Sequence, residues 1–297
     1  MVDPVEASAR GGAGGVGGGR GAYARVAARG GRAGMVFGIT EAAAVACSTL
    51  GYAAGYAALR CGGALPPGAA GAKRRAWVIT FANAVVCVLA ALPVTYRMLT
   101  GAWKEWRGGG RFYWVTMQQD EVETGFARAA STSFVGAMVA DLLVGVVDYR
   151  AHLDPLTAYF HHTIYVYIHA QILRMRCAAG FQCFFIEELP TVVLAYGRLT
   201  GQRFDLLYGS TFFLLRILFQ SWAMICIVTF PSFREALRCE DFMWVLLLSL
   251  GLHIYWFRGW VISYLKYLKK LRTASGREEP AVGRPAASGD AFKPKQS

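Results

Sequence analysis

The chain has 297 residues, of which 55% are hydrophobic and only 17% are charged. A soluble domain carries roughly 25% charged residues, so this composition indicates a polytopic membrane protein and argues against a soluble enzyme. The formal net charge of +12 comes from residues at the ends of apolar runs and in the two tails. That placement suits cytosolic loops and lipid headgroups, and it speaks against a nucleic-acid-binding face.

The chain is expected to start with a tail and a weak first membrane span. Residues 1–34 are rich in glycine, alanine and arginine, a composition that cannot bury a core, so we predict a disordered tail. Residues 35–59 form the first predicted span, although they are rich in alanine and glycine and contain Glu41. This span and its loop, residues 35–72, are treated as a unit that precedes the main domain at 73–270.

Six further apolar runs follow, each close to the ~20 residues that a helix needs to cross the hydrocarbon. The predicted spans are 77–98, 127–147, 156–175, 178–196, 211–230 and 242–265. Pro93 should break the first of these, and residues 99–126 should form a polar connection at the membrane interface. The predicted fold is therefore an all-α polytopic membrane protein with about seven transmembrane helices.

Basic residues after the last span predict a cytosolic C-terminus. They are Lys266, Lys269, Lys270 and Arg272. Residues 271–297 should form a disordered basic tail, which ends in the sequence KPKQS. That ending resembles the dilysine retrieval signal of endoplasmic-reticulum membrane proteins, so we expect an integral protein of that membrane.

Ionisable side chains are expensive inside a bilayer, and those of this chain gather in and near one stretch, 141–188. The candidate site residues are Asp141, His161, His162, Tyr165, His169, Glu187, Glu188 and Arg216. At ~100° per residue, His162, Tyr165 and His169 share one helix face, whereas His161 points in another direction. The alternative interpretation is that these groups are only hydrogen-bonded ties between helices, which we favour for His169 taken alone.

Two turn signals predict how the candidate residues approach one another. Asp154 and Pro155 suit a helix N-cap and first helical position, so the spans on either side should form an antiparallel hairpin. The depths of Asp141 and His162 below that turn then differ by ~7 Å, which allows a contact without requiring one. Pro190 should kink the next span beside its two glutamates, where Arg216 is a natural counter-ion for one of them.

This set of side chains would permit acyl transfer in a membrane cavity. Neutral histidine is a general base near pH 7 or a transient acyl acceptor, a carboxylate can orient it, and an arginine can stabilise an oxyanion. Metal chemistry fits less well, because five histidines are too few for the histidine boxes of membrane di-iron enzymes. No motif supports a haem between His169 and His253, so no metal or cofactor is expected.

Several motifs, in order, resemble the TLC domain family across residues 73–270. They are ADLLVGVVDYR, DPLTAYFHHTIYVY, EELPTVVLAYGRL, FFLLRILF and LHIYWFRGWVISYLKYLKK. The resemblance implies a six-helix barrel-like core around a lipid cavity, preceded here by one extra span. In the ceramide synthase branch the histidine pair joins fatty acyl-CoA to a sphingoid amine. By that resemblance His161 and His162 would be catalytic, with Asp141 and Glu188 as supporting acids.

The sequence departs from the ceramide synthase pattern, because Tyr165 replaces a threonine and the DxxD motif is missing. It looks more like the small TLC-domain-containing proteins that act in membrane lipid homeostasis. The first hypothesis is therefore a protein that binds or processes acyl lipids in an intramembrane cavity, with membrane lipids as partners and no nucleic acid. The alternative is a lipid N-acyltransferase with acyl-CoA as co-substrate. A receptor or channel is suggested only by the seven spans, and a homo-oligomer stays open.

Overall fold

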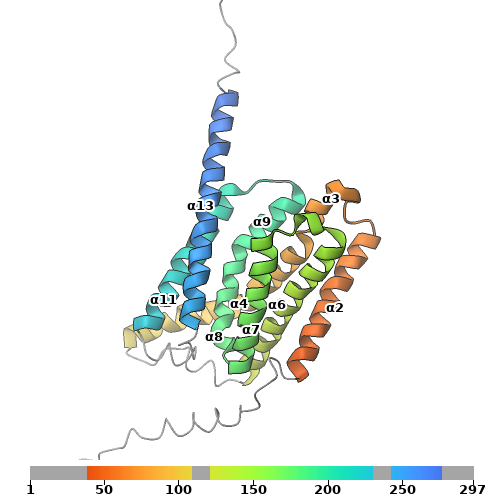
Figure 1. The fold of residues 1–297 in the computed structure, drawn as a ribbon. Helices are drawn as coiled ribbons and strands as arrows, with labels where there is room; N and C mark the ends of the chain where they lie inside the picture. The colour runs from red at the N-terminus through yellow and green to blue at the C-terminus, as the bar shows by residue number, and fades with distance from the viewer. Residues whose placement is uncertain (1–38, 109–120, 230–241, 276–297) are drawn as a thin grey trace, which may run out of the picture.

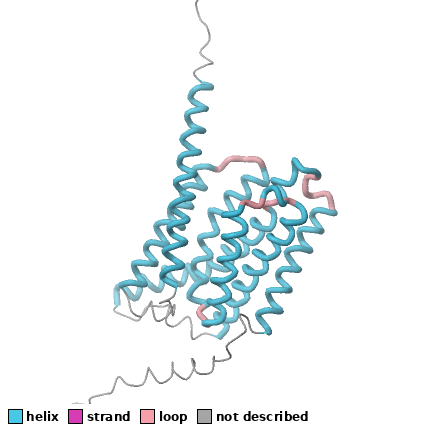
Figure 2. The backbone as a smooth tube through the Cα atoms, in the orientation of Figure 1, coloured by secondary structure: helices cyan, strands magenta, loops and turns pink. Residues whose placement is uncertain are grey.

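The computed structural model describes residues 39–108, 121–229 and 242–275, and every regular element in these ranges is a helix (Figures 1 and 2). The predicted all-α class is therefore confirmed. The predicted tail at 1–34 lies outside the described residues, as do the KPKQS ending and most of the predicted tail at 271–297.

The long helices of the chain are α2 (Ile39–Cys61), α4 (Val78–Gly108), α6 (Glu121–Asp148) and α13 (Phe242–Ser275), with the short α3 (Gly68–Arg75) before α4. Between α6 and α9 the described elements are the 3₁₀-helix η1 (Arg150–His152), the π-helix η2 (Pro155–Phe160), α7 (His161–Met175), α8 (Ala178–Phe181), the 3₁₀-helix η3 (Gln182–Glu188) and α9 (Leu189–Thr200). They are followed by α10 (Asp205–Phe212), the π-helix η4 (Phe213–Phe219) and α11 (Gln220–Thr229).

Six helical stretches within the described ranges are long and apolar enough to cross a membrane, which confirms a multi-pass membrane architecture. They are Thr40–Cys61, Gly71–Tyr96, Gly125–Asp148, Ala178–Thr200, Asp205–Thr229 and Met243–Thr273. The fourth of the seven predicted spans, 156–175, forms η2 and α7 but is not among the six. Helix α7 has only 15 residues, and its three histidines lower its hydropathy.

Three predicted boundaries are wrong, and in each case the helix extends beyond the prediction. Helix α4 continues through Pro93 to Gly108 without a break. Helix α6 begins at Glu121, so the connection predicted at 99–126 is largely helical at both ends. Helix α13 reaches Ser275, past the predicted start of the tail. An apolar run marks only the part of a helix inside the membrane, and a proline removes a single backbone hydrogen bond.

Helix α2 packs against the outside of α6. Glu41, which weakened the prediction of this span, forms an ion pair with Arg128 of α6. This contact explains how a helix of small residues can carry a carboxylate: the charge is paired with a neighbouring helix.

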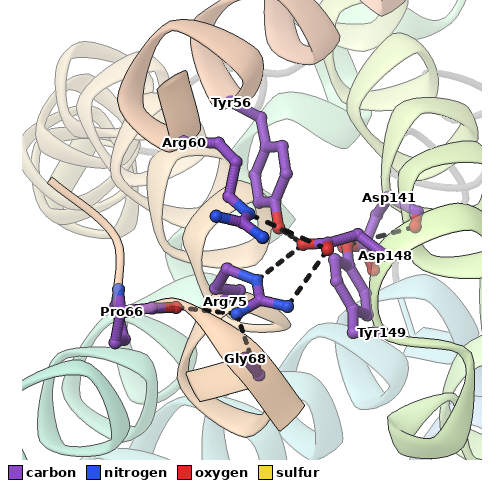
Figure 3. A network of polar contacts seen from close by, with 8 residues as sticks. All are labelled: Tyr56, Arg60, Pro66, Gly68, Arg75, Asp141, Asp148 and Tyr149. Atoms are coloured by element: carbon purple, nitrogen blue, oxygen red, sulfur yellow. Dashed lines mark hydrogen bonds and ion pairs between the residues drawn. The ribbon is translucent and has the colours of Figure 1, made fainter. Parts of the chain in front are cut away.

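A polar network around Asp148 joins α2, α3 and α6 at one end of the bundle (Figure 3). Arg75 donates to both carboxylate oxygens of Asp148, through Nε at 2.6 Å and Nη2 at 3.0 Å. The Tyr56 hydroxyl donates to the same carboxylate, and Arg75 Nη1 donates to the carbonyls of Pro66 and Gly68. Bidentate, charge-assisted bonds of this kind fix orientation, so α3 is held firmly against the ends of its neighbours.

Helices α6 and α7 form the predicted hairpin. Asp154 Oδ1 accepts a hydrogen bond from the backbone N–H of Leu156 at 3.0 Å, and Pro155 is the first residue of η2. The predicted cap at this turn is therefore confirmed. The helix type changes beside Pro190, because the 3₁₀-helix η3 ends at Glu188 and Pro190 lies in the first turn of α9, whereas the predicted kink stays a prediction.

Candidate functional site

A cavity of ≈ 820 Å³ lies within the bundle and is lined by residues from α3, α4, α6, α7, α9, α10 and α13. Its walls are mostly apolar and aromatic, and include Trp77, Phe134, Met138, Val193, Leu194, Phe204, Tyr208, Phe212, Trp256 and Trp260. No residue from α2 is among the described lining residues. Polar and charged side chains also line it, among them His161, His162, Glu188 and Arg216, and a cavity that combines apolar walls with convergent polar groups is typical of a site for a small molecule.

Both histidines of the pair line this cavity. Their ring centroids lie 5.8 Å apart, and the His161 ring packs against Tyr165 at 4.4 Å and against Trp256 of α13 at 5.5 Å. The expectation that His161 would point away from His162 is thus only partly met. Their directions differ, but the cavity is wide enough at the start of α7 to receive both rings.

Asp141 lies behind His162 and is not among the residues that line the cavity. Its Oδ2 is 3.7 Å from His162 Nε2. Its Oδ1 accepts a hydrogen bond of 2.6 Å from the Tyr149 hydroxyl, and Figure 3 shows these two side chains together. Burial raises the pKa of Tyr149, and the neighbouring Asp141 raises it further, so the phenol keeps its proton and stays a donor. The carboxylate is therefore positioned by Tyr149 and faces the imidazole.

Each histidine of the pair has a buried Nδ1 that makes no hydrogen bond to any described residue. Buried polar nitrogens nearly always have a partner in folded proteins. Both residues line the cavity, but these two nitrogens have almost no accessible surface, so they lie within its wall and would reach a bound polar group only if the rings moved.

Arg216 and Glu188 form the second polar feature of the cavity. Arg216 Nη2 donates to Glu188 Oε1 at 3.0 Å and to Thr191 Oγ1 at 2.7 Å, and Nε donates to the Glu187 carbonyl at 2.7 Å. The predicted pairing of Arg216 with one of the two glutamates is confirmed, and the partner is Glu188. The π-helix η4 carries Arg216 and the 3₁₀-helix η3 ends at Glu188, so both groups come from irregular helical turns.

The remaining predicted residues, Tyr165, His169 and Glu187, line a separate cavity of ≈ 70 Å³. The His169 ring lies between Phe134 and Phe185, at centroid distances of 4.6 and 5.3 Å. Tyr165 shares a hydrogen bond with a serine of α13 at 3.3 Å. His253 also lines this cavity, but the volume is far too small for a porphyrin. Tyr165, His169 and Glu187 thus lie in a space next to the larger cavity, and Phe134 lines both.

Sequence reasoning did not select several residues of the site. The sequence pattern does not mark Tyr149 as a site residue, because tyrosines are common near membrane interfaces. Asn83 is a lone amide within an apolar run and could have been noticed. Lys73, Arg74, Arg198 and Arg203 also line the cavity, although they were interpreted only as loop charges.

Within the described ranges, no group of three histidine, cysteine or carboxylate side chains could hold a metal ion. Comparisons with protein family models, with curated proteins and with solved structures gave no match. The geometry by itself therefore defines the class: an all-α multi-pass membrane protein with an internal cavity that contains a histidine pair.

Proposed function

We propose that this protein binds or processes acyl lipids in its internal cavity and acts in membrane lipid homeostasis, as a member of the TLC domain family. The observation that carries the proposal is the ≈ 820 Å³ cavity, in which an aromatic wall meets His161, His162, Glu188 and Arg216. An acyl chain would bury its methylene groups against that wall. A carbonyl or headgroup would then hydrogen-bond to the polar residues.

The family resemblance is supported by the position of α2. The TLC resemblance implies six core helices around a cavity and one extra span before them. In the structure α2 packs on the outside of α6, while helices from α3 to α13 supply the described lining residues.

Location in the endoplasmic reticulum with a cytosolic C-terminus belongs to the same proposal. In support of this location, the part of the chain that the structure describes carries several basic residues around the Asp148 network, and a cytosolic position for them would satisfy the positive-inside rule. Around the Asp148 network these are Arg60, Lys73, Arg74, Arg75, Arg150, Arg198 and Arg203, and α13 extends from this end with its own lysines (Figure 1).

The test is lipid analysis of the purified full-length protein and of two matched variants. Leu194→Trp fills the cavity, whereas Leu248→Trp adds the same bulk on an exposed surface of α13. We expect acyl lipids to co-purify with the wild type and with Leu248→Trp, and to be depleted at least several-fold in Leu194→Trp. Equal lipid content in all three proteins would refute binding in the cavity.

A second candidate function, lipid N-acyltransferase activity, is favoured by the contact between Asp141 and His162. Asp141 attracts the proton of His162 to Nε2, so Nδ1 is left as the basic nitrogen. Because Nδ1 is buried in the structure, the ring would first have to move to expose it to the cavity. Nδ1 would then take the proton of a lipid amine as the amine attacks the thioester carbonyl of acyl-CoA. The tetrahedral intermediate would collapse to the amide, and the leaving thiolate would receive that proton.

The enzyme hypothesis is tested with acyl-CoA and a long-chain amine, with His161→Ala and His162→Ala as variants. Amide formation or a histidine-linked acyl adduct in the wild type, lost in both variants, supports catalysis. If acyl lipid co-purifies with the wild type but neither turnover nor an adduct is found, catalysis is refuted and lipid binding remains as the function.

A further inference from the structure

One end of the large cavity is lined by four cationic side chains. Lys73 and Arg74 lie in the last turn of α3, Arg198 lies near the end of α9, and Arg203 lies in the loop that follows. Arg203 is neutralised by Asp205, to which its Nε and Nη2 donate at 2.9 and 3.1 Å. Among the described residues, no carboxylate forms an ion pair with Lys73, Arg74 or Arg198. We call these three residues the basic rim.

The loop after α9 helps to hold the basic rim in place. Gly201 ends α9 with φ +76°, a conformation that favours glycine, and a Cβ there would lie 3.4 Å from Arg74 Nη2. A Cβ on Gly197 would lie 2.8 Å from the backbone oxygen of Gln202, so the loop folds tightly over the end of the helix. Arg198 lies over the Trp77 ring, 5.9 Å from its centroid.

The basic rim and the histidine pair lie at opposite ends of the cavity. Arg198 follows Glu188 by ten residues along the same span, a helical rise of ~15 Å. On α13, Trp256 contacts His161, and Ser263 lines the cavity two turns later, a rise of ~10 Å. The space between is bounded largely by aromatic and aliphatic side chains. A ligand that matches this pattern has an anionic group at one end and an apolar part beside it.

We propose that the basic rim binds the phosphate of an anionic membrane phospholipid whose acyl chain occupies the cavity. The proposal rests on the proposed function and adds the headgroup to it. Arginine guanidinium groups bind phosphate oxygens in a planar, bidentate geometry, and lysine adds a compact positive charge. Lys73, Arg74 and Arg198 are all exposed, so the phosphate would meet them at the mouth of the cavity, beside the apolar walls that would hold the acyl chain. Because Arg75 fixes α3 to Asp148, the neighbouring Lys73 and Arg74 are positioned in advance.

The test measures lipid binding to the purified full-length protein by native mass spectrometry. The probes are phosphatidic acid, diacylglycerol with the same acyl chains, acyl-CoA and inorganic phosphate. The rim variant is Lys73→Gln/Arg74→Gln/Arg198→Gln. The control variant Lys269→Gln/Lys270→Gln/Arg272→Gln removes the same charge from exposed positions of α13 beyond the cavity.

We expect the wild type and the control variant to bind phosphatidic acid about tenfold more tightly than diacylglycerol, because charge-assisted hydrogen bonds to phosphate supply that preference. The rim variant should lose the preference and still bind diacylglycerol. Retained diacylglycerol binding also shows that the variant is folded, and an epitope tag at the C-terminus checks that its orientation is unchanged.

Other outcomes overturn the inference. If phosphatidic acid binding weakens equally in the rim variant and the control variant, only general surface charge is involved. If the wild type binds both lipids with equal affinity, the protein does not recognise the phosphate. Inorganic phosphate or acyl-CoA that binds the rim more tightly than phosphatidic acid would assign the rim to a soluble ligand. If neither lipid binds the wild type, the proposed function is refuted. If diacylglycerol binds and phosphatidic acid does not, the proposed function stands and only the proposal for the basic rim is refuted.

Discussion

His162 lies next to a carboxylate that is not among the residues that line the cavity, with Nε2 3.7 Å from Asp141 Oδ2. Asp141 is held by the Tyr149 hydroxyl on one oxygen and faces His162 Nε2 with the other. A buried carboxylate without its donor would either rotate or remain unsatisfied, and both would loosen the imidazole. Tyr149 is therefore a positioning residue, which acts on the cavity through two other side chains.

Replacement of Tyr149 by phenylalanine tests this role at the scale of one hydroxyl. Tyr149→Phe should lower the free energy of unfolding by about 1.5–3 kcal/mol, since a hydrogen bond to a buried carboxylate is lost. Tyr159→Phe, at an exposed position of η2, should change it by less than about 0.5 kcal/mol. Denaturant unfolding in detergent measures both. Equal free energies of unfolding for the two variants would show that the Tyr149–Asp141 hydrogen bond contributes little to stability.

The elements of the site depart from regular α-helix at the places where the polar groups lie. The π-helix η2 leads into His161, the 3₁₀-helix η3 ends at Glu188, and the π-helix η4 carries Arg216. Such turns rotate a side chain away from the direction that ideal spacing gives it. Close packing between elements sets the cavity wall as well. A Cβ on Gly209 of α10 would lie 2.1–2.7 Å from the Trp260 ring of α13.

An alanine at Gly209 tests the contact between α10 and α13. Gly209→Ala should displace the Trp260 ring, lower stability by about 1–3 kcal/mol and alter the co-purified lipid, because the ring lines the cavity. Gly251→Ala on α13 is the matched control, since its Cβ meets nothing within 4 Å. It should be neutral or stabilising. Thermal unfolding and lipid analysis measure the two effects, and a neutral result for Gly209→Ala would contradict the close contact.

At the scale of the whole molecule, the Asp148 network holds the basic end of the bundle together. Arg75 is almost fully buried and connects the α2–α3 loop, α3 and the last residue of α6. The basic rim belongs to the same end, so its geometry depends on this anchor. The same end thus combines an anchor outside the cavity with the cationic side chains that line it.

Arg75→Gln removes the anchor but keeps most of the side-chain volume. We expect a loss of about 1.5–3 kcal/mol in stability, because Asp148 and two carbonyls lose a charged donor. Arg150→Gln removes an exposed arginine at the same end and should change stability by less than about 0.5 kcal/mol. Unfolding in detergent compares the two variants, and similar values for both would mean that the network does not hold the helices together.

Much of the fold was predictable because membrane insertion depends on local composition. The apolar runs located six spanning helices, Asp154 and Pro155 located the start of η2, and Arg216 was matched correctly to the acids beside Pro190. The prediction failed at helix ends and at Pro93, where hydropathy carries no information about helix continuation. The span at 156–175 was also the least typical, because its polar side chains face the protein instead of lipid.

The sequence by itself determined the membrane class, the position of six apolar helices, and the residues whose polarity demands an explanation. Only the tertiary structure decided which of them share a cavity. His161 and His162 meet there, whereas His169 and Glu187 face a smaller space and Asp141 lies behind. Hydropathy acts residue by residue along the chain. A cavity, in contrast, is enclosed by side chains from helices far apart in sequence, so it depends on how those helices pack.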